Sequence, residues 1–259
     1  MGWHSKGGHD RTFGTNAKAW DWCSVNNAGF EYYQNAKKDG IGLPPHNPRI
    51  WVFRHQSNAS CAPMLRRVWH PIGYSSNSGW SNFFINITAG RLLTYTNTLL
   101  KFALPDIVIG TGGGYNTYDI YESVNHELSH ASHFNKVGSA FWAKYVNYII
   151  TYGKKYDHPY GDASCNNSGF CGVGEMWGYA MGYIRTYEKY QQKPKNGQNR
   201  WFQPNLLYDL MTEKILTKKQ IFDCLSSDVT SHALLKQKMI SRYPSKKDSI
   251  IAKFSRYGF

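Results

Sequence analysis

The stretch His126-Glu127-Leu128-Ser129-His130 decides how this chain is interpreted. It lies within residues 118–136, which the sequence predicts to form one helix. A helix turns about 100° per residue, so residues i and i+4 share a face and the two imidazoles can converge on one metal ion. Glu127 is one position further round, where its carboxylate can reach a water on that ion without binding the ion. The spacing therefore predicts His126 and His130 as metal ligands and Glu127 as a general base.

The residues around the motif support a helix at this place. Asn116 and Thr117 are candidate N-caps after a glycine-rich loop, and Gly138 is a plausible end. The residues expected to form an apolar side of the helix are Tyr118, Tyr121, Val124, Leu128 and Phe134.

A catalytic zinc site usually has three protein ligands and one open position for water. Among the Glu residues after the motif, Glu188 and Glu213 are flanked by Lys or Arg and are expected on solvated helix faces. Glu175 opens a stretch, residues 174–184, that is predicted to be a helix thin enough to pack closely on the motif helix. A carboxylate in the first turn of a helix is also favourable with the helix dipole. Glu175 is therefore the predicted third ligand, and Asp162 is the alternative.

His133 is not expected to complete the site. It lies about 10 Å along the helix axis from His126, too far to share an ion with both other imidazoles. The pattern HExxHxxGxxH also fails, because His133 stands where Gly is required and Lys136 stands where the third His is required.

An HExxH sequence followed by a Glu on a later helix resembles the gluzincin-type zinc metallopeptidases. The matching residues are His126, Glu127, His130 and Glu175, and the resemblance covers roughly residues 106–190. It implies a zincin-like catalytic domain with Zn²⁺ as cofactor. Two departures concern the subfamily: Gly172 stands where the usual Asn-x-x-Glu form has Asn, and the interval from His130 to Glu175 is longer than in the best-known members.

The predicted fold is a helix-dominated α+β domain with a small N-terminal sheet and a helical C-terminal part. Residues 1–48 are expected to be an irregular segment, and residues 49–259 a single zincin-like domain. Strands are predicted at 49–55 and 106–109, with the second as an exposed edge that could pair with an extended peptide. Loops are expected over 58–82 and 153–173. Further helices are predicted at 84–103, 139–152, 205–213, 217–225 and 232–242.

Composition limits where the protein acts and what it binds. The chain of 259 residues has a net charge of +13, but its Lys and Arg are spread along the sequence without a recognition motif, so no nucleic-acid partner is expected. No apolar run of about 18 residues occurs, which predicts no transmembrane segment. The first five residues lack the apolar region of a signal peptide.

The five cysteines leave two interpretations open. Cys165 and Cys171 could close a small disulfide loop before Glu175, and Cys23 could pair with Cys61, leaving Cys224 over. Free core cysteines are the alternative. The disulfide interpretation favours a secreted or cell-surface, extracytoplasmic location.

The function expected from these residues is that of a zinc-dependent endopeptidase acting on peptide or protein substrates, with Glu127 as catalytic base. Tyr179, Tyr183 and His232 are candidate donors to the developing oxyanion. Two other functions fit the same motif: a non-catalytic metal-containing binding protein for a glycan or protein ligand, and a zinc hydrolase of a non-peptide amide.

Overall fold

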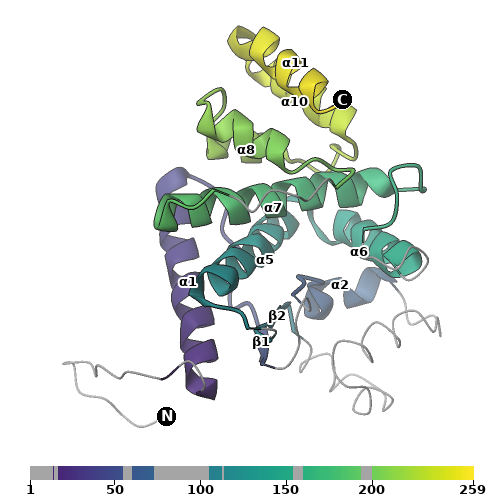
Figure 1. The fold of residues 1–259 in the computed structure, drawn as a ribbon. Helices are drawn as coiled ribbons and strands as arrows, with labels where there is room; N and C mark the ends of the chain where they lie inside the picture. The colour runs from purple at the N-terminus through teal and green to yellow at the C-terminus, as the bar shows by residue number, and fades with distance from the viewer. Residues whose placement is uncertain are drawn as a thin grey trace.

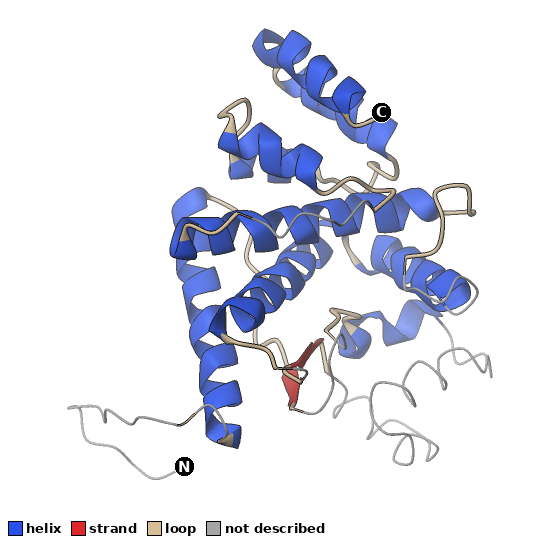
Figure 2. Cartoon of the chain, in the orientation of Figure 1, coloured by secondary structure: helices blue, strands red, loops and turns tan. Residues whose placement is uncertain are grey.

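The computed structural model describes Gly14 and residues 17–54, 60–72, 105–112, 114–153, 160–193 and 200–259. Helices dominate these residues, and two short strands form a small parallel sheet (Figure 2). The helices are α1 (Lys18–Asp39), α2 (Leu65–Ile72), α5 (Thr117–Val137), α6 (Ser139–Gly153), α7 (Ser168–Tyr190), α8 (Asn205–Thr212), α9 (Lys218–Cys224), α10 (His232–Arg242) and α11 (Lys247–Arg256), with a 3₁₀ turn η1 (Pro244–Lys246). The expected helix-dominated chain with a small sheet is confirmed.

Helix α5 is the central element, with α7 crossing it on one side and the sheet on the other (Figure 1). Its ends are those the sequence predicts. Asn116 caps its first turn in a reciprocal capping box with Asp119, and Gly138 ends it with a φ of 82°. The helix differs from the expected one-sided amphipathic helix because every residue from Val124 to Phe134 is buried. A helix buried on all sides is normally apolar throughout, so the polar residues of α5 require an explanation.

Helix α7 packs against α5 through glycines spaced four residues apart. A Cβ added at Gly178 would lie 2.7 Å from the His130 ring, and one added at Gly182 would lie 3.2 Å from the Glu122 carbonyl oxygen, so α7 and α5 approach closely. This confirms the predicted thin helix. The predicted start at Gly174 is wrong, because α7 begins at Ser168. Glu175 therefore lies in the third turn, where the dipole of the helix start does not act on it.

The sheet pairs β1 (Ile50–Phe53) with β2 (Ile107–Gly110) in parallel, with Ile50 opposite Ile107. Both strands lie within the predicted ranges. The expectation that β2 is an exposed edge is wrong. Val108 exchanges backbone hydrogen bonds of 2.8 and 3.0 Å with Cys61 on the side away from β1, so both sides of β2 are occupied.

The segment before the sheet also differs from its prediction. Residues 18–39 form α1 rather than an irregular segment, and Gly40 ends this helix in the left-handed conformation. The residues that α1 buries against α5 recur at helical spacing: Val25, Ala28, Tyr32 and Ala36. Asn26, Asn27 and Gly29 are weak helix formers, and tertiary packing overrides them.

The loop expected over 58–82 contains helix α2 among its described residues. Arg66 and Arg67 of this helix bond to the buried Asp106 carboxylate at 2.9 and 3.1 Å, and this ties α2 to the start of β2. The helix predicted at 84–103 lies outside the described residues.

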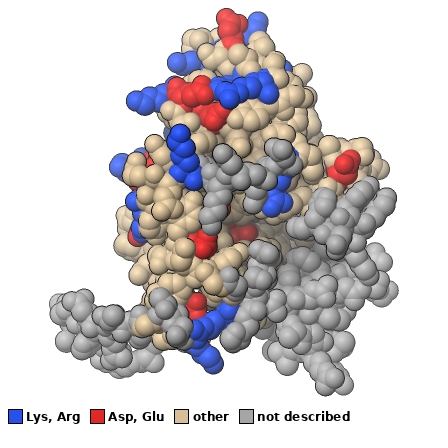
Figure 3. Space-filling model, in the orientation of Figure 1, with Lys and Arg blue, Asp and Glu red and all other residues tan. Residues whose placement is uncertain are grey.

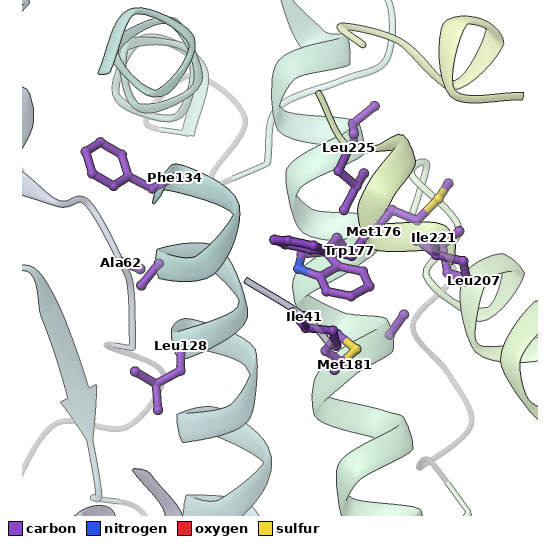
Figure 4. Packing of buried hydrophobic residues seen from close by; sticks show 14 of the residues in the cluster. Ile41, Ala62, Leu128, Phe134, Met176, Trp177, Met181, Leu207, Ile221 and Leu225 are labelled. Atoms are coloured by element: carbon purple, nitrogen blue, oxygen red, sulfur yellow. The ribbon is translucent and has the colours of Figure 1, made fainter. Parts of the chain in front are cut away.

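The later helices follow the predictions closely and complete the core above α7. Helices α6, α8, α9 and α10 match their predicted ranges within one or two residues, and α11 was not predicted. Met176, Trp177 and Met181 of α7 pack with apolar side chains of α8 and α9, whereas Leu128 lies on the other side of α5 (Figure 4). Trp177 also donates to the Ser129 carbonyl at 3.2 Å, which joins α7 to α5.

All five cysteines are free thiols, so of the two interpretations the structure agrees with free cysteines, and neither Cys165–Cys171 nor Cys23–Cys61 is a disulfide. Cys171 is buried within α7. Among the described helices, none combines the length and apolarity needed to cross a membrane.

Candidate metal centre

The two histidines of the motif point at each other from successive turns of α5. Their Nε2 atoms lie 2.9 Å apart, and His126 and His130 are both buried. Glu127 brings its Oε1 to 3.8 Å from the His126 Nε2. The ligand atoms of these three residues all lie within 4.8 Å of one another. The predicted convergence of the HExxH side chains is present in the structure.

Glu175 reaches the same point from α7. Its Oε2 lies 3.5 Å from the His126 Nε2 and 3.6 Å from the His130 Nε2. These separations are too long for good hydrogen bonds. They match the roughly 3.3 Å between two ligand atoms that share an ion tetrahedrally at about 2.0–2.1 Å. The three atoms are therefore close enough to share one metal ion.

The polar atoms around this point support the fit to an ion. Within the part of the chain that the structure describes, Glu175 Oε2 and Glu127 Oε2 are buried without a hydrogen-bond partner. Leaving such atoms unpaired costs about 1–3 kcal/mol each, and more for charged groups. An ion of positive charge would satisfy the carboxylates and the imidazole lone pairs together.

Gly178 provides the space beside the histidines. A Cβ at this position would lie 2.7 Å from both Cε1 and Nε2 of His130, and 3.1 Å from the His126 Cε1. The backbone of α7 at Gly178 therefore lies directly against both imidazoles. The side chain of any larger residue at this position would be too close to them.

The ionisation of the ligands also suits a cation. Burial, followed by the charge of His130, lowers the pKa of His126 to about 4, so this imidazole is neutral at pH 7 as a ligand must be. Burial works to raise the pKa of Glu175, but the interactions with the facing imidazoles of His130 and His126 outweigh it and hold that pKa below its usual range. Burial and the nearby Glu175 raise the pKa of Glu127 well above its ordinary value. A carboxylate whose pKa moves towards neutrality is a better general base.

The remaining predicted candidates lie elsewhere. Asp162 is exposed, and its Oδ1 accepts hydrogen bonds from the backbone and side chain of Ser164 at 2.8 and 2.6 Å. His133 is fully buried against the Phe141 and Trp142 rings, and neither of its ring nitrogens has a hydrogen-bond partner in the described ranges of the chain. Asp162 therefore holds a turn, and His133 takes no part in the convergence.

Tyr179 contacts the imidazole of His126 and is itself in contact with Tyr160 and Arg200. The Tyr179 ring lies 4.3 Å from this imidazole, and the Tyr179 hydroxyl lies 2.8 Å from that of Tyr160. The Arg200 guanidinium lies 4.5 Å from the centre of the Tyr160 ring and 4.8 Å from the centre of the Tyr179 ring. Of the three candidate oxyanion donors, Tyr179 is the one in contact with a motif histidine. His232 instead stacks on Phe259 at 4.1 Å.

Sequence reasoning missed Tyr145. Its hydroxyl donates to Glu175 Oε1, and its ring lies 5.8 Å from that of His130. Burial and the charge of Glu175 raise the pKa of this phenol well above its usual value, so it remains a donor at neutral pH. Nothing local in the sequence indicates this contact, because Tyr145 stands on a separate helix among other aromatic residues.

The two departures from the gluzincin pattern have structural reasons. A Cβ at Gly172 would lie 2.7 Å from the Trp201 ring and 2.8 Å from the His232 ring, so these rings fill the space that an Asn side chain would need. The long interval between His130 and Glu175 contains α6, which packs on α7 and supplies Tyr145. Comparison with protein-family models, with curated proteins and with solved structures gives no match.

Proposed function

We propose that the protein is a zinc-dependent endopeptidase of the gluzincin type. The observation that carries this proposal is the meeting of His126, His130 and Glu175 at zinc-ligand separations, with Glu127 beside them. Zinc is favoured because imidazole and carboxylate ligands in a four-coordinate arrangement with one open position suit this ion.

The chain's own residues would divide the work of amide hydrolysis. Zinc, when bound, supplies Lewis acidity and lowers the pKa of water to about 7. Glu127 takes a proton from the attacking water on its carboxylate and delivers it to the leaving amine. Tyr179, paired with Tyr160, is the nearest donor for the developing oxyanion. The buried surroundings strengthen each of these electrostatic interactions.

The test compares Glu127→Gln with His130→Ala in the zinc-loaded protein. Glu127→Gln keeps the size of the side chain and removes its basicity, so the variant should retain stoichiometric zinc while hydrolysis falls by at least about 10²-fold. His130→Ala should lose both zinc and activity. The readouts are metal analysis and mass spectrometry of a peptide library. Glu188→Gln, at an exposed Glu of α7, is the matched control and should change neither.

Equal cleavage by Glu127→Gln and the parent would contradict the mechanism. A parent that binds zinc and cleaves only a non-peptide amide would redirect the proposal to that substrate class.

One observation favours a second candidate, a binding protein in which the metal is not catalytic. The exposed fractions of His126, Glu127, His130 and Glu175 are 8%, 4%, 2% and 3%. Side chains buried to this degree leave little access for a polypeptide substrate, whereas a metal ion that only stabilises the fold needs none. A zinc-loaded parent that cleaves nothing across the library would favour this function. An extracytoplasmic location stays a prediction, and the free thiols remove the disulfides on which it rested.

A further inference from the structure

The carboxylate of Glu175 is divided between two environments. Its Oε2 faces the Nε2 atoms of His126 and His130 at 3.5 and 3.6 Å. Its Oε1 accepts the hydroxyl hydrogen of Tyr145. One oxygen is therefore available to an ion, and the other is engaged by the protein.

The position of Tyr145 is fixed on several sides. Its side chain is buried, and its ring lies 4.6 Å from the Trp142 ring, one turn earlier on α6. Gly174 lets the same ring approach α7, since a Cβ there would lie 3.3 Å from it. The hydroxyl is thus held on Glu175 by packing, and it does not depend on a flexible side chain.

We propose that Tyr145 is a positioning residue that restricts Glu175 to ligation through one oxygen. The inference rests on the metal site proposed above. A carboxylate with both oxygens free binds a cation through one oxygen or through both. A phenol donating to Oε1 opposes ligation through that oxygen, and this leaves one coordination position for water or substrate. Groups of this kind around metal ligands typically change affinity or activity by 10–100-fold when removed.

Tyr145→Phe tests this assignment because it removes the hydroxyl and keeps the ring. The parent and the variant are loaded with Co²⁺ in place of zinc, and their visible absorption spectra are compared. A four-coordinate Co²⁺ site absorbs more strongly than a five-coordinate one. Release of Oε1 should therefore weaken the absorption of the variant. Its zinc dissociation constant, measured by competition with a chelator, should change by about 10–100-fold.

Tyr32→Phe is the matched control. Tyr32 is also fully buried, and its hydroxyl lies 2.7 Å from that of Ser132 on α5, so this variant loses a comparable hydrogen bond away from the ligands. Its Co²⁺ spectrum and zinc affinity should equal those of the parent. If both variants alter the spectrum equally, the effect is one of packing and the positioning role is overturned.

A double-mutant cycle separates this inference from the proposed function. In a Glu175→Ala background, adding Tyr145→Phe should change the zinc affinity no further, because the hydroxyl acts only through Glu175. A parent that binds zinc and a Tyr145→Phe variant with unchanged spectrum and affinity would overturn the role of Tyr145 and leave the metal site standing. A parent that binds neither zinc nor Co²⁺ would overturn the metal site itself.

Discussion

Charged groups are buried both between α5 and α7 and between α8 and α11. The two interfaces differ in whether these groups have hydrogen-bond or ion-pair partners. At α8 and α11, Lys253 is 8% exposed and pairs with Glu213, while Asp209 accepts the Tyr257 hydroxyl at 2.7 Å. Acidic and basic side chains are interspersed there at the top of the molecule (Figure 3). At α5 and α7, Glu127 Oε2 and Glu175 Oε2 are buried and have no hydrogen-bond partner among the described residues.

This difference is the one expected between a structural role and the proposed metal site. Buried charges that serve the fold are paired and hydrogen-bonded, because desolvation is otherwise too costly. The α8–α11 interface obeys that rule. The α5–α7 interface would satisfy it if a cation joined the group, which is the arrangement expected of the proposed metal site.

The largest expected effect comes from filling the space between the two helices. Gly178→Ala places a Cβ 2.7 Å from the His130 ring, so the ring or the helix must shift. Overpacking of this kind costs about 1–3 kcal/mol in the free energy of unfolding. The shift should also weaken zinc binding by at least about tenfold, which corresponds to about 1.4 kcal/mol. Denaturant unfolding and chelator competition measure the two effects.

Gly29→Ala is the control for this prediction. A Cβ at Gly29 meets only the Leu128 Cδ1 at an ordinary 3.8 Å, and the residue lies inside α1. Alanine is the better helix former, so this variant should gain about 0.5–1 kcal/mol of stability without altering zinc affinity. If Gly178→Ala is as stable as the parent and binds zinc with the same affinity, the backbone of α7 does not lie against the imidazoles as described.

The sequence predicts those parts of the site that depend on local geometry. The i,i+4 spacing alone places His126 and His130 together, and the cap at Asn116 and the end at Gly138 follow from local hydrogen-bonding rules. Glu175 could be selected by elimination, because the small residues near it predict close packing. Its position in the third turn was missed, since the glycines that permit that packing also resemble a helix boundary.

What the sequence could not predict depends on contacts between distant segments. The Tyr145 hydroxyl meets Glu175 only because α6 packs against α7. Helix α1 forms in a segment rich in weak helix formers because its apolar side packs on α5. The pairing of Cys61 with Val108, which occupies the free side of β2, has no local pattern at all.

An intermediate effect on stability is expected at His133, which is buried one turn after His130 on α5. Burial, followed by the charges of His130 and Lys136, lowers its pKa from 6.5 to about 3. Between these values the unfolded chain binds the proton and the folded protein does not, so stability is lost as the pH falls through this range. His133→Phe should reduce the loss between pH 7 and pH 5 by about 2 kcal/mol.

Urea unfolding of the metal-free protein at the two pH values measures this change. His126 and His232, whose pKa values are lowered to about 4, act in the same direction and remain in the variant. Phe134→Leu, at the next buried position of α5, provides the control, because it alters packing without removing a titratable group and should leave the difference between the two pH values as it is. An unchanged pH dependence in His133→Phe would mean that the His133 imidazole is solvated or paired in solution.

The smallest effect is expected where the charges are paired. Lys253→Met preserves the bulk of the side chain and removes its charge from Glu213 and Asp209. Glu213 is 47% exposed and becomes hydrated, while Asp209 keeps the Tyr257 hydroxyl. The loss should therefore be about 1 kcal/mol and not the larger penalty of a fully buried unpaired charge. Lys238→Met, at the exposed pair with Asp228, should cost less. Zinc affinity should be unchanged in both variants, because this interface needs no ion to satisfy its charges. A fall in zinc affinity for Lys253→Met alone would mean that the two interfaces are coupled and that the contrast between them is wrong.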